Sequence, residues 1–117
     1  MKPKLTITHI YDSANKKVTL KLKRTGGPPR DRTVVMIKVL KRANSGAVEW
    51  VKVGGAEYVS LGGFGGLGGG GDDRTFIQDL PGASSYSVVV LAWDRNSPPT
   101  SPSRRNEYLS WTRKVVV

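Results

Sequence analysis

The chain has 117 residues, 38% of them hydrophobic, and a net charge of +10 at pH 7, which suits one domain with a single core. It contains no cysteine and one histidine, His9, so disulfides and thiolate metal sites are excluded and few groups are available for acid–base chemistry. No stretch reaches the length of a signal-peptide core or a membrane span, so we expect no membrane insertion. The protein is expected either to be made and used without Sec export or to be a domain taken from a longer chain.

The positive charge is concentrated in the first third of the chain. Residues 1–42 hold twelve Lys and Arg against two acidic residues, whereas residues 43–117 hold seven of each sign. This asymmetry predicts an electropositive surface for an anionic partner, which would be a capsid or other protein surface, a polysaccharide or nucleic acid. A solvated surface that only keeps the protein soluble explains the same charges equally well.

Short alternating segments predict β-strands in the first half of the chain. Leu5–Ile10 alternates and then slips by one residue, which is typical of a first strand with a bulge. Lys17–Lys23 alternates without interruption, with its lysines facing outward. Residues 32–41 form a β-branched run and predict a third strand, and a turn at residues 43–46 leads into a strand at 47–53.

The second half of the chain contains an unusual glycine tract. In residues 61–71, eight of eleven residues are glycine. Four strands are expected around it, at residues 57–60, 74–80, 86–92 and 106–117. About seven short strands without helical periodicity predict an all-β fold, an antiparallel sandwich of two sheets. We expect one domain over residues 1–117, with a Gly-rich loop insertion at 61–73.

The segment Leu80–Ala92 carries the most specific structural signal. A Pro-Gly turn follows Leu80 and leads to Tyr86, from which every second residue is expected to face the core. This is typical of a tyrosine corner, in which the ring is buried and the hydroxyl bonds back to the turn backbone. The segment resembles the E–F corner and strand F of a fibronectin type III domain. The first two strands of that family resemble two further patterns here, Leu5-x-Ile7-x-x-Ile10 and Val18-x-Leu20-x-Leu22.

This resemblance implies an immunoglobulin-like sandwich and covers most of the chain, including a final loop and strand compatible with Ser101–Thr112. Two features depart from the family. Leu22 stands where the family usually has a tryptophan, and the glycine tract is an insertion. An immunoglobulin-like sandwich of another topology is the main structural alternative.

Catalysis is poorly supported by the sequence. Residues 63–68 satisfy G-x-G-x-x-G, but dinucleotide binding by that motif needs a preceding strand and a following helix, which are not predicted. The tract is interpreted either as a flexible loop or as a loop ordered by the apolar anchors Phe64 and Leu67. No nucleophile elbow or pair of catalytic acids is present. We therefore expect no enzymatic activity, no catalytic or metal site and no cofactor.

The strand phases predict an apolar surface. If alternate residues from Tyr86 face the core, and if Lys38 is kept out of it, the intervening residues of the strand at 32–41 and of the strand that begins at Tyr86 face outward. These two strands are neighbours in one sheet of the expected fold, so their outward residues form one patch. The patch consists of Val34, Met36, Leu40, Val89, Leu91 and Trp93, extended by Trp50 and Trp111. Such a patch indicates a surface covered by a partner, or by the glycine loop through Phe64 and Leu67.

A basic face is predicted on the opposite sheet. It consists of Lys17, Lys21, Lys23 and Arg24 along the second strand. A stripe of this kind can follow phosphates in a salt-sensitive, sequence-nonspecific way. Lysines on an outer strand also discourage aggregation without any ligand.

These observations predict a non-enzymatic structural or adhesive module that docks onto a protein assembly, through a protein partner or through self-assembly, and is oriented by its basic charge. By analogy, a small sandwich beginning at Met1 resembles a virion component, such as a phage decoration or tail-associated protein. One alternative is an extracellular accessory domain that binds carbohydrate or a cell surface. Another is a sequence-nonspecific binder of nucleic acid.

Overall fold

The computed structural model describes residues 2–42, 50–58, 61, 73–81, 85–98 and 108–116. These residues contain seven β-strands and one 3-10 turn, η1 (Arg30–Arg32). The strands are β1 (Lys4–Asp12), β2 (Lys17–Gly26), β3 (Thr33–Arg42), β4 (Trp50–Tyr58), β5 (Asp73–Asp79), β6 (Ser85–Asp94) and β7 (Tyr108–Val116).

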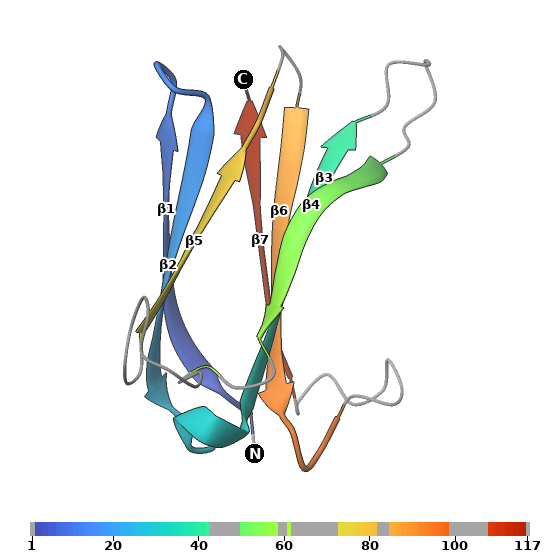
Figure 1. Cartoon of the computed structure of the whole chain (residues 1–117). Helices are drawn as coiled ribbons and strands as arrows, with labels where there is room; N and C mark the ends of the chain where they lie inside the picture. The colour runs from blue at the N-terminus through green and yellow to red at the C-terminus, as the bar shows by residue number, and fades with distance from the viewer. Residues whose placement is uncertain are drawn as a thin grey trace.

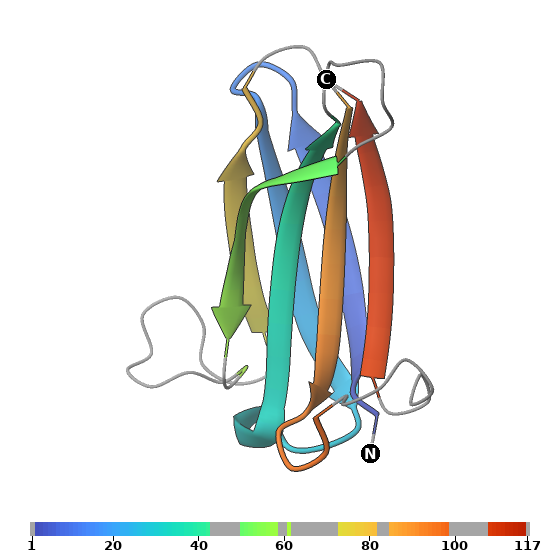
Figure 2. The ribbon, with the colours of Figure 1, turned by 90° about the vertical axis from the view of Figure 1, so that its right-hand side faces the viewer.

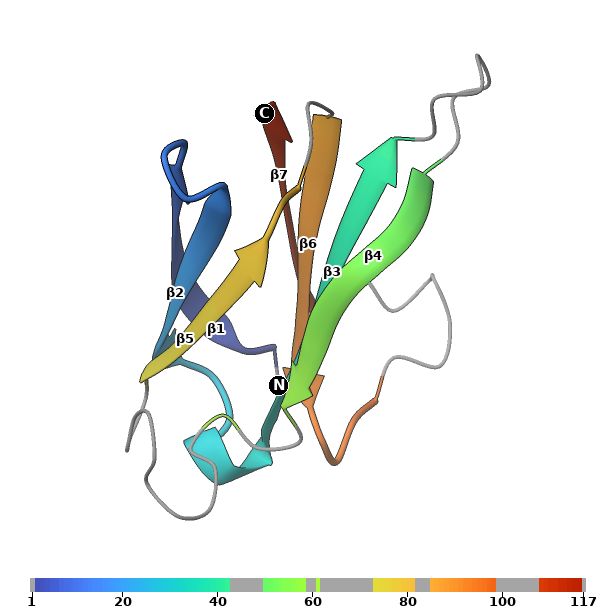
Figure 3. The ribbon, with the colours of Figure 1, turned by 45° about the horizontal axis from the view of Figure 1, so that its top comes forward.

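The strands form two antiparallel sheets that pack face to face (Figure 1). One sheet has the order β1-β2-β5 and the other the order β4-β3-β6-β7. Figure 2 looks onto the four-stranded sheet, which lies in front of the three-stranded one, and Figure 3 shows the two layers from nearer one end. The predicted all-β antiparallel sandwich is confirmed.

The core lies between the two sheets and follows the alternation of the strands. Burying one valine, leucine, isoleucine or phenylalanine side chain stabilises the folded state by about 1.5–3 kcal/mol relative to leaving it exposed. Packing alone can therefore stabilise a chain that lacks disulfides. The inward phases predicted for the strands that became β2, β3 and β6 are confirmed. The core consists of Val18, Leu20, Leu22, Val35, Ile37, Val39, Leu61, Phe76, Leu80, Tyr86, Val88, Val90, Ala92 and Val115.

The tyrosine corner predicted at Leu80–Ala92 is also present. The side chain of Tyr86 is buried, and its hydroxyl donates a hydrogen bond to the carbonyl oxygen of Pro81. The backbone N–H of Leu80 donates to the carbonyl oxygen of Lys16 at 2.8 Å. These bonds tie the turn before β6 to the neighbouring sheet and set which residues of β6 face the core.

The bulge expected near the end of Leu5–Ile10 lies elsewhere. The register of β1 on β2 shifts between Lys4 and Leu5 and then continues regularly, with His9 opposite Leu20. His9 therefore has the inward phase, while Ile10 points outward and is 58% exposed. The predicted position of the bulge was wrong because His9, although polar, takes an inward position. It can do so because β1 is the edge strand of its sheet, where His9 stays exposed to solvent.

Residues 50–58 form one strand rather than parts of two. β4 continues through Gly54 and Gly55, with a register shift against β3 between Val39 and Leu40. Gly55 has φ +145°, and a β-carbon there would collide with the carbonyl oxygen of Ile37. The register shift leaves Val53 as the extra, bulged residue, and only glycine fits at position 55 just after it. What reads in the sequence as a strand break is therefore an irregularity within one strand.

Two contacts hold the end of the sandwich that contains η1. The guanidinium of Arg32 donates to both carboxylate oxygens of Asp94, at 3.0 and 3.1 Å. The backbone N–H of Leu61 lies 3.0 Å from each of the carbonyl oxygens of Arg30 and Thr33, and the Leu61 side chain is fully buried. Leu61, predicted to begin the loop insertion, is therefore a core residue, and Asp73, predicted to end it, belongs to β5.

Candidate docking surface

The outer side of the four-stranded sheet carries a continuous apolar region across β3 and β6. The pairing of the two strands places Val34 opposite Trp93 and Met36 opposite Leu91. Directly opposed residues of antiparallel strands lie on the same side of the sheet, and the intervening residues Val35 and Ala92 are in the core. We call the six predicted residues of this region the β3–β6 face: Val34, Met36, Leu40, Val89, Leu91 and Trp93.

These side chains cover one another in part. Val34 is buried and the other five are half-buried. Two apolar side chains on the opposite outer side, Ile10 and Ile77, are more exposed, at 58% and 59%. They flank Thr19 as isolated residues, which is common on protein surfaces. The β3–β6 face differs because apolar side chains fill two consecutive rows, Val34 with Trp93 and Met36 with Leu91, and Val89 adjoins Leu91 in the next row.

The structure places the two tryptophans predicted to flank this region on different sides of the sheet. Trp50 lies opposite Arg42, at the end of β4, in the same outward phase as Leu40. Trp111 lies opposite Val90 and packs against the core, so it does not extend the β3–β6 face. The prediction was wrong because the register of β7 on β6 turns Trp111 inward.

Tyr108 of β7 adjoins the β3–β6 face and was not predicted from the sequence. It lies opposite Trp93 and is half-buried. Val34, Trp93 and Tyr108 therefore form one row across three strands. The alternation of β7 would have identified Tyr108, had Trp111 first been assigned to the inner side.

Positive charge gathers at one end of the same surface. Lys38 lies opposite Val89, and Lys52 lies opposite Leu40. Lys114 lies opposite Ser87, while Arg42 lies beside Trp50. Among the described outward residues of this sheet, Glu57 is the acidic one. The sequence placed charge and apolar area on opposite sheets, but the structure brings an apolar region and four cations onto one side.

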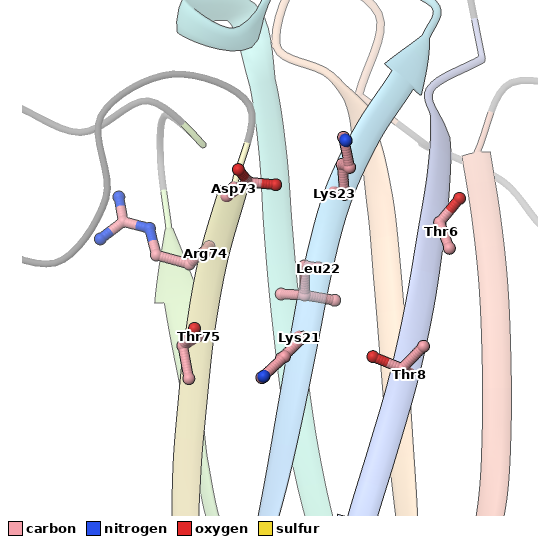
Figure 4. Close-up of a pocket in the computed structure, with 8 residues that line it drawn as sticks. All are labelled: Thr6, Thr8, Lys21, Leu22, Lys23, Asp73, Arg74 and Thr75. Atoms are coloured by element: carbon pink, nitrogen blue, oxygen red, sulfur yellow. The ribbon is translucent and has the colours of Figure 1, made fainter.

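The lysines of β2 lie on the other outer side, as predicted, but they are not alone there (Figure 4). Lys17 lies between Asp12 and Asp79, and its ammonium is 3.8 Å from the Asp79 carboxylate. Lys23 lies opposite Asp73. These carboxylates offset much of the positive charge. The hollow drawn in Figure 4 has a volume of about 410 Å³ and is lined by Thr6, Thr8, Lys21, Leu22, Lys23, Asp73, Arg74 and Thr75.

Arg24 does not belong to this basic face. It follows the inward phase of Leu22, is half-buried, and its guanidinium donates to the carbonyl oxygen of Pro28 at 3.3 Å. The prediction for Arg24 was wrong because alternation along β2 turns it toward the inner side. Lys21, between Thr8 and Thr75, is the lysine of this stripe without an acidic residue directly opposite.

The border between β1 and β7 holds an aromatic contact. The rings of His9 and Trp111 meet edge to face with their centroids 5.9 Å apart. The guanidinium carbon of Arg113 lies 5.0 Å from the centroid of the Trp111 ring. The residues described include no group of three His, Cys, Asp or Glu side chains placed to hold a metal ion.

Two further sequence predictions concern the glycine loop and membrane insertion. Phe64 and Leu67, the proposed anchors of the glycine loop, lie outside the described residues. Within the part of the chain that is described, no helix has the length and apolar character needed to cross a membrane.

No protein-family model, no curated protein and no solved structure matches this chain.

Proposed function

We propose that this protein is a non-enzymatic docking module that attaches to a larger protein assembly through the β3–β6 face. The observation that carries the proposal is the row formed by Val34, Trp93 and Tyr108, continued by the adjoining pair Met36 and Leu91. Burying apolar area contributes about 25 cal/mol per Å². Tryptophan and tyrosine are common anchors at protein interfaces because they combine large area with few rotatable bonds.

The charges beside this region favour a partner with an acidic surface. Lys38, Lys52 and Lys114 are interleaved with or border the apolar side chains. Charges at the rim of an interface contribute mainly to orientation and association rate. In our proposal the apolar rows hold the partner and the cations orient it.

The biological setting follows from analogy. The tyrosine corner and the strand patterns support membership of the fibronectin type III family, a fold that serves many structural and adhesive roles. A virion decoration or tail-associated role and an extracellular adhesive role both need such a docking face. They differ in the partner, which is a protein in the first case and a carbohydrate or cell surface in the second.

Binding of nucleic acid through β2 is the less favoured alternative. Phosphate contacts need cations whose charge is available to the backbone. The carboxylates of Asp12, Asp73 and Asp79 lie opposite Lys17 and Lys23 in the sheet, which reduces the attraction for a polyanion on this side.

The proposal is tested by site-specific photo-crosslinking in the organism that makes the protein. A photoreactive amino acid replaces Leu91 on the β3–β6 face or, as the control, Thr8 on the opposite outer side. We expect one discrete protein adduct from position 91, none from position 8, and loss of the adduct when Trp93→Glu is added. No adduct from position 91, or the same adduct from both positions, would refute the proposal.

A further inference from the structure

β7 is a border strand of the four-stranded sheet (Figure 2). Its nine residues pair with β6 in continuous register, from Tyr108 opposite Trp93 to Val116 opposite Ser85. No strand among the described residues pairs with its other side. Half of its backbone N–H and C=O groups therefore point along the sheet plane toward a position where another strand fits.

The other border strands carry features that discourage pairing. β4 is interrupted by the bulge at Val53 and by the positive φ of Gly55. β5 has seven residues and an aspartate at each end. β1 contains the register shift after Lys4, and at its other end the Asp12 carboxylate accepts hydrogen bonds from the backbone N–H groups of Ala14 and Asn15. Short strands, bulges and charged ends are the usual means of protecting a sheet edge. β7 has no bulge, and its charges lie together at Arg113 and Lys114.

We propose that β7 pairs antiparallel with β7 of a second copy of this chain, about a two-fold axis at Thr112. A strand can pair with itself only if its sequence is complementary when reversed. When β7 is reversed about Thr112, no residue is set opposite one of like charge, and the aliphatic Leu109 meets the aliphatic Val115. The opposed pairs are Trp111 with Arg113, Ser110 with Lys114, Leu109 with Val115, and Tyr108 with Val116.

Two conditions select the register between the two β7 strands: opposed side chains must lie on the same side of the sheet, and like charges must not face each other. Residues that face each other across a continuous sheet must point to the same side, so the axis must pass through a residue rather than between two. An axis at Arg113 or Lys114 would set two like charges opposite each other, which is unfavourable. An axis at Trp111 would set the aliphatic side chain of Leu109 opposite the charged Arg113, which is a poor match. The side chain of Val116 is 76% exposed in the single chain. An axis at Thr112 covers Val116 with the Tyr108 side chain of the second copy.

The side chains of β7 are already arranged for this pairing. Arg113 lies over the ring of Trp111 within one chain, with 5.0 Å between the guanidinium carbon and the ring centroid. Each indole in the pair would then lie beside a guanidinium of the other copy, a favourable cation–π arrangement. The two sheets would join into one, with both β3–β6 faces on the same side. The pairing itself does not depend on the proposed docking function.

Disulfide trapping tests the register. The chain has no cysteine, so Thr112→Cys introduces a single thiol at the axis. Opposed residues of antiparallel strands have Cα atoms about 4.5–5.5 Å apart, within the range that a disulfide can bridge. The control Ser110→Cys would place its two thiols about 13 Å apart along the strand. Both positions are exposed, so the variants should fold.

Under mild oxidation, we expect Thr112→Cys to give a disulfide-linked dimer, and Ser110→Cys and Thr8→Cys to stay monomeric. Equal dimer yields from positions 110 and 112 would overturn the proposed register. A dimer from position 8, on β1, would overturn the assignment to β7, as would the absence of a Thr112→Cys dimer.

A charge test addresses the same register without oxidation. Ser110→Glu would face Lys114 of the second copy and strengthen dimerisation about threefold to tenfold, because two symmetric ion pairs form. Ser110→Lys would face the same lysine and weaken dimerisation by a similar factor. Analytical ultracentrifugation measures both dissociation constants. Changes of the same sign, or none, would overturn the proposal. Leu91→Glu, which tests the docking function, should leave the dimer intact.

Discussion

The hydroxyl of Tyr86 donates a hydrogen bond to the carbonyl oxygen of Pro81, five residues earlier in the chain. The ring is buried in the core, and this burial, with a smaller effect of nearby Tyr11, raises the pKa of the Tyr86 hydroxyl. Because Tyr86 is fixed inward, alternate residues of β6 must point outward. The same contact that closes the turn thereby places Val89, Leu91 and Trp93 on the β3–β6 face.

Replacing Tyr86 by phenylalanine tests the structural part of this relationship. Tyr86→Phe keeps the ring but leaves the Pro81 carbonyl without this donor, so we expect a loss of about 1–2 kcal/mol in the free energy of unfolding. Urea denaturation measures it. Tyr108→Phe, which removes the same atom on the outer side, should cost less. Equal losses of unfolding free energy in the two variants would show that the Tyr86–Pro81 hydrogen bond stabilises the fold no more than the hydroxyl of Tyr108 does.

The pair of Arg32 and Asp94 predicts a loss of stability in acid. The hydrogen bonds from Arg32, helped by the backbone N–H of Asn96, hold the pKa of the buried Asp94 carboxyl below its usual value. In an unfolded chain the pKa of an aspartate is about 3.9. The stabilisation is therefore present above that pH and is lost as the pH falls through the lower folded-state pKa.

Urea denaturation between about pH 7 and about pH 2.5 measures this dependence. Asp94→Asn and Arg32→Gln should each lower stability at neutral pH and flatten the acid slope. The double variant should have the same slope as either single variant. A double variant with a flatter slope than both would show that the two residues act separately.

The backbone of β4 just after its bulge predicts that two adjacent glycines respond differently to the same change. Gly55→Ala should lower the free energy of unfolding by about 1–3 kcal/mol, because φ is +145° and the new β-carbon meets the Ile37 carbonyl oxygen. Gly54→Ala meets only the end of the Gln78 side chain, which can move. Thermal unfolding compares them. A similar loss at both positions would contradict the account of the bulge.

The distribution of charge predicts which lysines matter for an acidic partner. Lys38→Glu or Lys52→Glu should reduce the yield of the adduct formed from position 91, and added salt should reduce it in the same direction. Lys17→Glu and Lys21→Glu, on the opposite outer side, should leave the yield unchanged. Equal effects from both sheets would show that net charge alone controls binding.

Alternation in the sequence predicts the phases of β2, β3 and β6, because their inward residues are apolar and close in sequence. The position of Trp111 could not be predicted in this way, because it depends on how β7 pairs with β6. The charge balance on β2 depends on aspartates from β1 and β5, distant in sequence. Leu61 carries no periodic signal beside its glycines, yet its backbone N–H anchors it to η1 and β3.

The most direct test of the docking face is the fraction of the protein that co-sediments with a larger assembly in the organism that makes it. Wild type is compared with Leu91→Glu on the β3–β6 face and with Thr75→Glu on the opposite outer side, each shown by circular dichroism to be folded. We predict that Leu91→Glu stays with the free protein while Thr75→Glu sediments like wild type. A folded Leu91→Glu variant that sediments with the assembly as fully as wild type would contradict the account.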